Sequence, residues 1–161
     1  MYSFKTKRLV RSYTLKFMAS PDLVFPLLCP EREREWIPGW EYEMIYSDSG
    51  LIEEGCVFKT PNTYGAETIW TVVKYDQTNY EIVFVKYCKD MLVEEMHICL
   101  KKQDGNGNTN ATVKYTYTPF TEKGNQFIEN FTEENFINQM SVLEKYMNQF
   151  LLNTGSALGI R

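Results

Sequence analysis

The chain has 161 residues, a length that suits one domain with a buried core. Its net charge of −4 disfavours the phosphate backbone of a nucleic acid as a partner. Aromatic residues reach 15% of the composition, with 11 Tyr, 10 Phe and 3 Trp, which suits either a ring-filled core or a hollow that recognises an apolar guest. We therefore expect a single domain over residues 1–161 and no nucleic-acid partner.

The first part of the chain predicts a strand followed by two short helices. Residues 8–17 alternate apolar and polar side chains, the pattern of a strand with one buried face. Ser20 and Pro21 then supply an N-cap and a proline at the first helical position, which together start a helix. Two further prolines keep this helix short, and residues 31–36 are expected to form a second helical turn.

The middle of the chain predicts six strands separated by turn-forming residues. The connections are short enough for hairpins, so the strands should form an antiparallel meander. Long twisted strands curl a sheet, and we expect a curved one. The expected strands span 41–47, 54–60, 66–75, 80–87, 91–102 and 111–120.

The tail changes its period and predicts one long amphipathic helix over residues 132–152. Thr132 can cap this helix, Phe131 can staple onto Phe136, and Gly155 marks its end. A helix about 30 Å long can cross the whole sheet, and its apolar face should lie on the concave side. The expected fold is therefore α+β, with a seven-stranded curved antiparallel sheet wrapped around a long C-terminal helix.

Several local stretches accompany this order of elements. They are residues 20–25, the Trp-Ile-Pro-Gly-Trp run at 36–40, and the stretches 55–58, 70–72 with 75–76, and 115–118 with 122–125. Together they resemble the START-like helix-grip superfamily (SRPBCC), which includes the birch-pollen allergen, polyketide cyclases and lipid-transfer proteins. The resemblance covers residues 8–152. It implies a helix-grip fold with a cavity between the sheet and the last helix that holds sterols, polyketides, fatty acids or similar guests.

The candidate ligand contacts are the side chains expected to face the space between sheet and helix. The strand residues lie on the more apolar of the two alternating faces of their strands, and the helix residues form the apolar stripe of the C-terminal helix. Two tryptophans bracket a proline-glycine bend near the expected mouth. Every member of this set could also be plain core. The set is Tyr13, Trp36, Trp40, Trp70, Phe84, Met96, Tyr115, Tyr117, Phe136, Met140, Leu143 and Met147.

Glu94 is the candidate for proton transfer. It shares the parity of Met96 and Ile98, and a carboxyl turned toward an apolar cavity could move protons. Exposure at the end of a strand is the alternative interpretation. His97 is the only histidine and falls on the outward face, so we expect a solvated or structural role for it.

Motifs for metals and cofactors are missing from the sequence. The four cysteines have no CxxC spacing, and the glycines near residue 105 precede no helix that could hold a phosphate. No apolar run reaches the roughly 20 residues that span a bilayer. We expect no metal, no cofactor and no membrane insertion, and a cytoplasmic protein that is a monomer or a homodimer.

Three functions stay open on this basis. The first is binding or transport of a small hydrophobic molecule, such as a lipid, a polyketide or an aromatic compound, in the implied cavity. The second is an enzyme of the polyketide cyclase or dehydrase type that acts by shape and by acid/base groups. The third, implied by other uses of the superfamily fold, is a protein-interaction domain of the co-chaperone kind.

Overall fold

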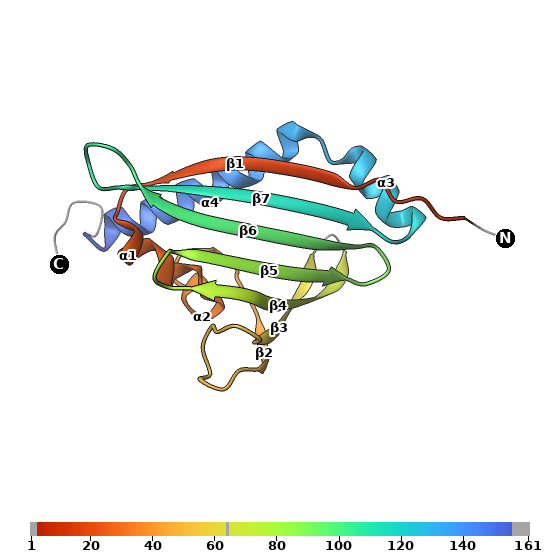
Figure 1. Ribbon diagram of the computed structural model, residues 1–161, viewed down its shortest axis with the longest axis horizontal. Helices are drawn as coiled ribbons and strands as arrows, with labels where there is room; N and C mark the ends of the chain where they lie inside the picture. Colours follow the sequence, from red (N-terminus) through yellow and green to blue (C-terminus); the bar gives the residue numbers. More distant parts are fainter. Residues whose placement is uncertain (1–2, 64, 156–161) are drawn as a thin grey trace.

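The computed structural model describes residues 3–63 and 65–155. One antiparallel sheet of seven strands has the order β1-β7-β6-β5-β4-β3-β2, so the first strand lies beside the last. Figure 1 shows the long helix α4 running lengthwise behind the upper strands of this sheet. The strands are β1 (Leu9–Phe17), β2 (Glu43–Tyr46), β3 (Val57–Thr63), β4 (Ala66–Asp76), β5 (Glu81–Cys88), β6 (Leu92–Lys102) and β7 (Thr109–Pro119). The α+β architecture and all seven predicted strands are confirmed.

The short helices after β1 are also confirmed, with one change in how they begin. They are α1 (Pro21–Val24), the 3₁₀ turn η1 (Phe25–Leu28) and α2 (Pro30–Glu33). A proline stands in the first turn of each, where the missing N–H has no intrahelical partner to lose. Ser20 occupies the N-cap position of α1, but its side chain makes no capping hydrogen bond there.

Strand residues alternate between the two faces of the sheet. In β5 the residues buried against the helix side are Ile82, Phe84, Lys86 and Cys88. Pairing irregularities interrupt the β2–β3 and β4–β5 ladders, and such bulges bend the strands that carry them. The bent sheet therefore presents a concave, mostly apolar face to α4.

The long helix α4 (Glu133–Asn153) begins and ends as the sequence predicts. The Thr132 hydroxyl accepts the Asn135 backbone N–H, and the Asn135 side chain accepts the Thr132 N–H, which completes a capping box. The rings of Phe131 and Phe136 pack edge to face at 6.4 Å. Gly155 has a φ of +79°, the left-handed conformation that ends a helix.

Side chains of α4 also hold the free edge of β1. The Glu144 carboxylate accepts the Lys16 backbone N–H at 2.8 Å, and the Asn148 amide oxygen accepts the Met18 N–H at 2.9 Å. The Asn148 amide N–H donates to the Lys16 carbonyl at 2.9 Å. Asn125 binds the backbone just ahead of β1 in the same two-way manner. The helix is thus bonded to the strand as well as packed on the sheet.

A further helix, α3 (Glu122–Asn130), was not expected from the sequence. The Thr121 hydroxyl caps it by accepting the Gly124 N–H at 3.1 Å, and the same hydroxyl donates to the Asp90 carbonyl at 2.7 Å. A β-carbon on Gly124 would lie 2.1 Å from the Met91 carbonyl oxygen. The glycine that weakens the helical pattern is therefore the residue that lets α3 reach the β5–β6 turn.

None of the described helices is both long enough and apolar enough to cross a bilayer. Within the same residues, no cluster of three His, Cys, Asp or Glu side chains could hold a metal ion.

Candidate functional site

A cavity of about 780 Å³ lies between the concave face of the sheet, the first half of α4 and the segment around α2. Its size falls within the range of about 300–1,000 Å³ typical of sites for small molecules. Asn135, Asn138 and Gln139 are exposed on α4, while Ile37 and Trp40 are half-buried, so the cavity opens between α4 and the segment after α2. The remaining lining residues are Leu15, Phe17, Leu28, Glu33, Trp36, Phe58, Trp70, Phe84, Lys86, Met96, Ile98, Ala111, Val113, Tyr115, Phe131, Met140, Val142 and Leu143.

Aromatic rings from three adjacent strands and the bend after α2 form one wall of the cavity. Phe58 stacks on Trp70 with ring centroids 5.3 Å apart, and Phe84 meets Trp70 edge to face at 5.8 Å. Trp40 approaches Trp70 edge to face at 6.4 Å. Because each ring is held by at least one other, this wall is preorganised for a flat apolar guest.

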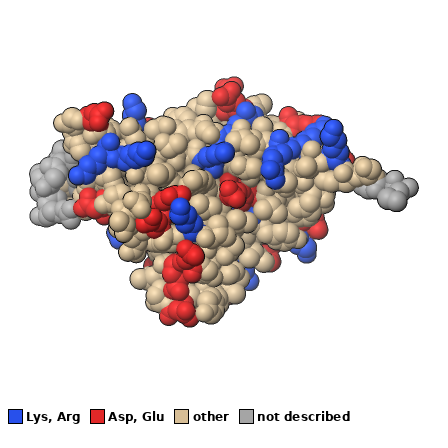
Figure 2. Space-filling view, viewed as in Figure 1, with Lys and Arg blue, Asp and Glu red and all other residues tan. Residues whose placement is uncertain are grey.

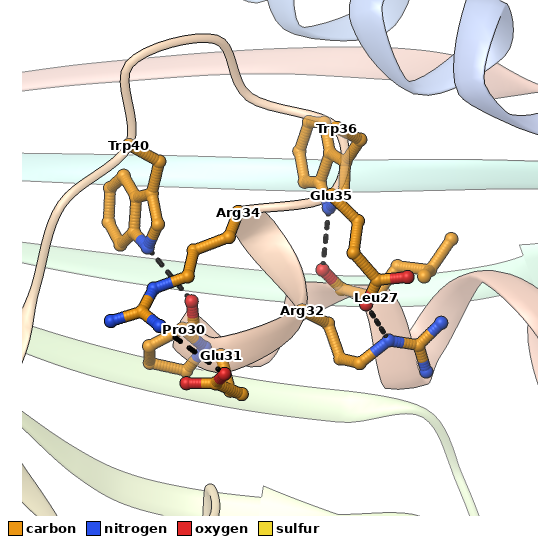
Figure 3. Close-up of polar contacts among 8 residues, drawn as sticks. All are labelled: Leu27, Pro30, Glu31, Arg32, Arg34, Glu35, Trp36 and Trp40. Atoms are coloured by element: carbon orange, nitrogen blue, oxygen red, sulfur yellow. Dashed lines mark hydrogen bonds and ion pairs between the residues drawn. The ribbon is translucent and has the colours of Figure 1, made fainter.

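The indole N–H groups of the cavity are bonded to the protein. Trp36 donates to the Leu27 carbonyl and Trp40 donates to the Pro30 carbonyl, both at 2.8 Å (Figure 3). Trp70 donates at 3.0 Å to a threonine hydroxyl of β3. These bonds fix the positions of the rings, so a guest would meet the tryptophans through their carbon surfaces.

A buried ion pair lies at the base of this wall. The Lys86 ammonium is 3.0 Å from a Glu94 carboxylate oxygen, and the two side chains are 6% and 0% exposed. Lys86 and Glu94 are directly paired across β5 and β6, and the ammonium also lies 4.5 Å from the centroid of the Trp70 ring. Lys86 lines the cavity, and Glu94 supports it from the neighbouring strand. Exposure of Glu94 at a strand end, one of the two interpretations from the sequence, is wrong.

Glu33, at the end of α2, brings a carboxyl into the cavity. The residue as a whole is half-buried, but its carboxyl is surrounded by protein atoms. The resulting loss of hydration disfavours the charged form and raises the pKa of Glu33 from 4.5 to about 8. At neutral pH this carboxyl is mostly protonated, so it can both donate and accept a hydrogen bond.

Tyr115, on β7, lines the cavity as well. Burial raises the pKa of its hydroxyl, and the nearby carboxylates of Glu94 and Glu33 raise it further. Its ring packs edge to face on Phe136 of α4 at 5.3 Å. The hydroxyl is therefore a neutral hydrogen-bonding group that shares the cavity with the Glu33 carboxyl.

Eight of the twelve predicted contact residues line the cavity. They are Trp36, Trp40, Trp70, Phe84, Met96, Tyr115, Met140 and Leu143. Their contact with a ligand stays a prediction.

The other four residues lie elsewhere. Tyr13 is partly buried on β1, and Tyr117 packs on the rings of Tyr115 and Phe131. Phe136 is buried between the same two rings, and Met147 is buried further along α4. All four belong to or pack against the solid part of the core. His97 lies on the outer face, as expected, within 2.7 Å of a Glu81 oxygen.

The polar members of the lining were not identified from the sequence. Lys86 did leave a signal, because it stands on the apolar parity of β5 and faces an acid on the adjacent strand. Glu33 left none, since it is one of several acids in the alternating run Glu-Arg-Glu-Arg-Glu at 31–35.

No family model matches this chain, and a search of curated proteins finds no significant match. Solved structures do match it. Norcoclaurine synthase from Thalictrum flavum is 14% identical, with a TM-score of 0.69 over 96% of this chain and 100% of that chain. Ara h 8.0201 is 12% identical, with a TM-score of 0.63 over 91% and 99% of the two chains.

The Zhui aromatase/cyclase from Streptomyces sp. R1128 is 12% identical, with a TM-score of 0.59 over 88% of this chain and 93% of that chain. Identities this low bear on the fold alone. All three proteins have a curved sheet gripping a long C-terminal helix. This chain shares their helix-grip fold.

Proposed function

We propose that this protein binds a small hydrophobic molecule, such as a lipid, a polyketide or an aromatic compound, in the cavity between the sheet and α4. The observation that carries the proposal is the cavity of about 780 Å³ with its wall of fixed aromatic rings. Removing an apolar guest from water contributes roughly 25 cal/mol per Å² of buried surface. The few polar groups of the lining would set the orientation of the guest.

Structural neighbours support a small aromatic guest. The norcoclaurine synthase from Thalictrum flavum has been solved in complex with dopamine and hydroxybenzaldehyde. The Streptomyces neighbour is an aromatase/cyclase, a name that also points to ring-shaped molecules.

Binding of the neutral fluorophore N-phenyl-1-naphthylamine tests the proposal. Its fluorescence should rise on addition of the wild-type protein and fall when apolar aromatic competitors are added. Leu143→Trp replaces a lining leucine with a bulkier indole side chain. It should weaken binding at least tenfold, because the indole occupies volume that the guest needs.

Leu152→Trp is the matched control, since Leu152 lies exposed near the end of the same helix and outside the lining. This variant should bind as the wild type does. Failure of the wild-type protein to bind any apolar probe would refute the proposal.

An acid/base enzyme is the second candidate function, and the titratable groups inside an apolar cavity favour it. Glu33 and Tyr115 both line the space that a guest would fill, whereas Glu94 reaches it only through Lys86. The group best placed to transfer a proton is thus Glu33 and not Glu94. Incubation with β-polyketones or aromatic aldehydes, followed by mass spectrometry, tests this function: wild type should convert a bound compound, and Glu33→Gln should not.

A further inference from the structure

Glu33 lacks the basic partner that its neighbours in sequence have. The two arginines beside it are both engaged by other acids of the same turn: Arg32 pairs with Glu35, and Arg34 pairs with Glu31 at 3.5 Å (Figure 3). These two ion pairs lie on the exposed side of α2. Within the described residues, no Lys, Arg or His pairs with Glu33.

The other charged and titratable groups around the cavity leave Glu33 uncompensated. On the sheet, the Lys86 charge is neutralised by Glu94, and the Tyr115 hydroxyl is neutral below pH 9 because its pKa is raised. On α4, the polar lining groups are the uncharged amides of Asn135, Asn138 and Gln139. With Glu33 ionised, the lining carries one negative charge that no protein group balances.

The cavity already shows how it accommodates an ammonium group. Lys86 lies with its ammonium 4.5 Å from the Trp70 ring centroid while it pairs with a carboxylate. Glu33 lines the same cavity as Trp36 and Trp40, whose N–H groups are bonded elsewhere, so a carboxyl and indole ring surfaces are again available to an ammonium group. The faces of indole rings attract cations, most strongly where water is excluded.

The approach to the cavity is acidic. The segment 31–43, which includes the bend at the mouth, contains five glutamates and two arginines. On the face of the molecule turned away from α4, Figure 2 shows acidic side chains running toward the lower tip and basic side chains gathering over the upper strands. The net negative charge of segment 31–43 raises the local concentration of cations at the mouth of the cavity.

We propose that the cavity selects aromatic amines, with the aromatic body packed against the wall formed by Trp40, Trp70 and Phe84 and the protonated amine paired with the Glu33 carboxylate. This inference rests on the proposed function, because it specifies the class of ligand for the same cavity.

Binding of an amine should release a proton, whereas binding of a purely apolar ligand should not. The pKa of Glu33 is about 8, so this carboxyl carries a proton at pH 7 before the ligand arrives. An incoming ammonium keeps its own proton and favours the carboxylate, so the Glu33 proton is released to solvent. At pH 7 the release should amount to about 0.9 proton per bound amine.

Isothermal titration calorimetry with naphthalen-2-ylmethylamine and naphthalen-2-ylmethanol, which share the same naphthalene ring, tests the inference. Wild type should bind the amine at least tenfold more tightly than the alcohol at pH 8. The apparent affinity for the amine should rise by roughly tenfold between pH 6 and pH 7 and level off above pH 8, while that for the alcohol stays constant. Titrations in phosphate and in Tris should give the proton release from their difference in heat.

Glu33→Gln should lose both the preference for the amine and the proton release, but it should bind the alcohol as the wild type does. Glu35→Gln, an exposed acid two residues away, should behave as the wild type does. Equal binding of both compounds by the wild type, or amine binding without proton release, would overturn the inference and leave the proposed function standing. If neither compound binds, the proposed function itself fails. Should Glu33→Gln not fold, the proton count on the wild type still decides the question.

Discussion

At the scale of single residues, the Lys86–Glu94 pair combines a charged bond with near-complete burial. Removing one partner from such a pair strands the other charge in a medium that cannot hydrate it. Lys86→Met should therefore lower the free energy of unfolding by about 3–5 kcal/mol. The double variant Lys86→Met/Glu94→Leu should recover most of this loss, and urea denaturation measures both.

Lys74→Met provides the comparison, because in the Lys74–Glu81 pair at 3.0 Å the two side chains are 49% and 21% exposed. It should cost no more than about 1 kcal/mol. A loss of similar size for Lys86→Met would mean that the buried pair contributes no more than a surface one.

Glu33 makes the stability of the fold depend on pH. Its pKa is about 8 in the folded chain against 4.5 when hydrated, so between these values the folded state holds a proton that the unfolded state has lost. The free energy of unfolding should thus fall as pH rises through this window, which is opposite in sign to a salt-bridged acid. Glu33→Gln removes the titration and should stabilise the protein at pH 9 by about 3–5 kcal/mol relative to wild type, since each pKa unit corresponds to about 1.4 kcal/mol.

Denaturation curves at pH 5, 7 and 9 check this prediction. The exposed Glu35→Gln variant should follow the wild-type curve within about 0.5 kcal/mol at every pH. If the free energy of unfolding depends on pH in the same way for wild type and Glu33→Gln, the Glu33 carboxyl is hydrated and the prediction is wrong.

At the scale of secondary-structure elements, α3 depends on one close approach. Since a β-carbon on Gly124 would lie 2.1 Å from a backbone oxygen of the β5–β6 turn, Gly124→Ala must displace either the helix or the turn. We expect a loss of at least about 2 kcal/mol in the free energy of unfolding. Lys123→Ala, an exposed position in the same turn of α3, should stay within about 0.5 kcal/mol of wild type.

The elements could be predicted from the sequence wherever periodicity and capping agreed. The alternation in each strand and the three- and four-residue spacing of α4 are local signals, and Thr132, Phe131 and Gly155 act as the sequence suggests. For α3 the signals conflicted. Gly124 and Asn125 weaken the helical pattern, and both are explained only by tertiary contacts, with the β5–β6 turn and with the backbone ahead of β1.

At the scale of the whole molecule, the sequence could indicate which side chains face inward but not where the interior is hollow. Parity placed Trp70, Phe84 and Tyr115 on the concave face together with Tyr117. Tyr117 is nevertheless in solid core, because Phe131 and its neighbouring rings fill the space beneath it. Whether a given inward residue borders the cavity depends on packing between distant elements, and Glu33 illustrates this most clearly, since its role follows from where α2 docks.

The bonds from α4 to the edge of β1 matter for how molecules of this protein behave toward one another. A sheet edge with unpaired amides and carbonyls can recruit a strand from another copy and begin aggregation. Here the rim formed by β1 is occupied over its last residues by Glu144 and Asn148, and the opposite rim is the four-residue, bulged strand β2. The helix that closes the cavity thus also shields the ladder, so concentrated solutions of the folded protein should resist polymerisation through strand addition.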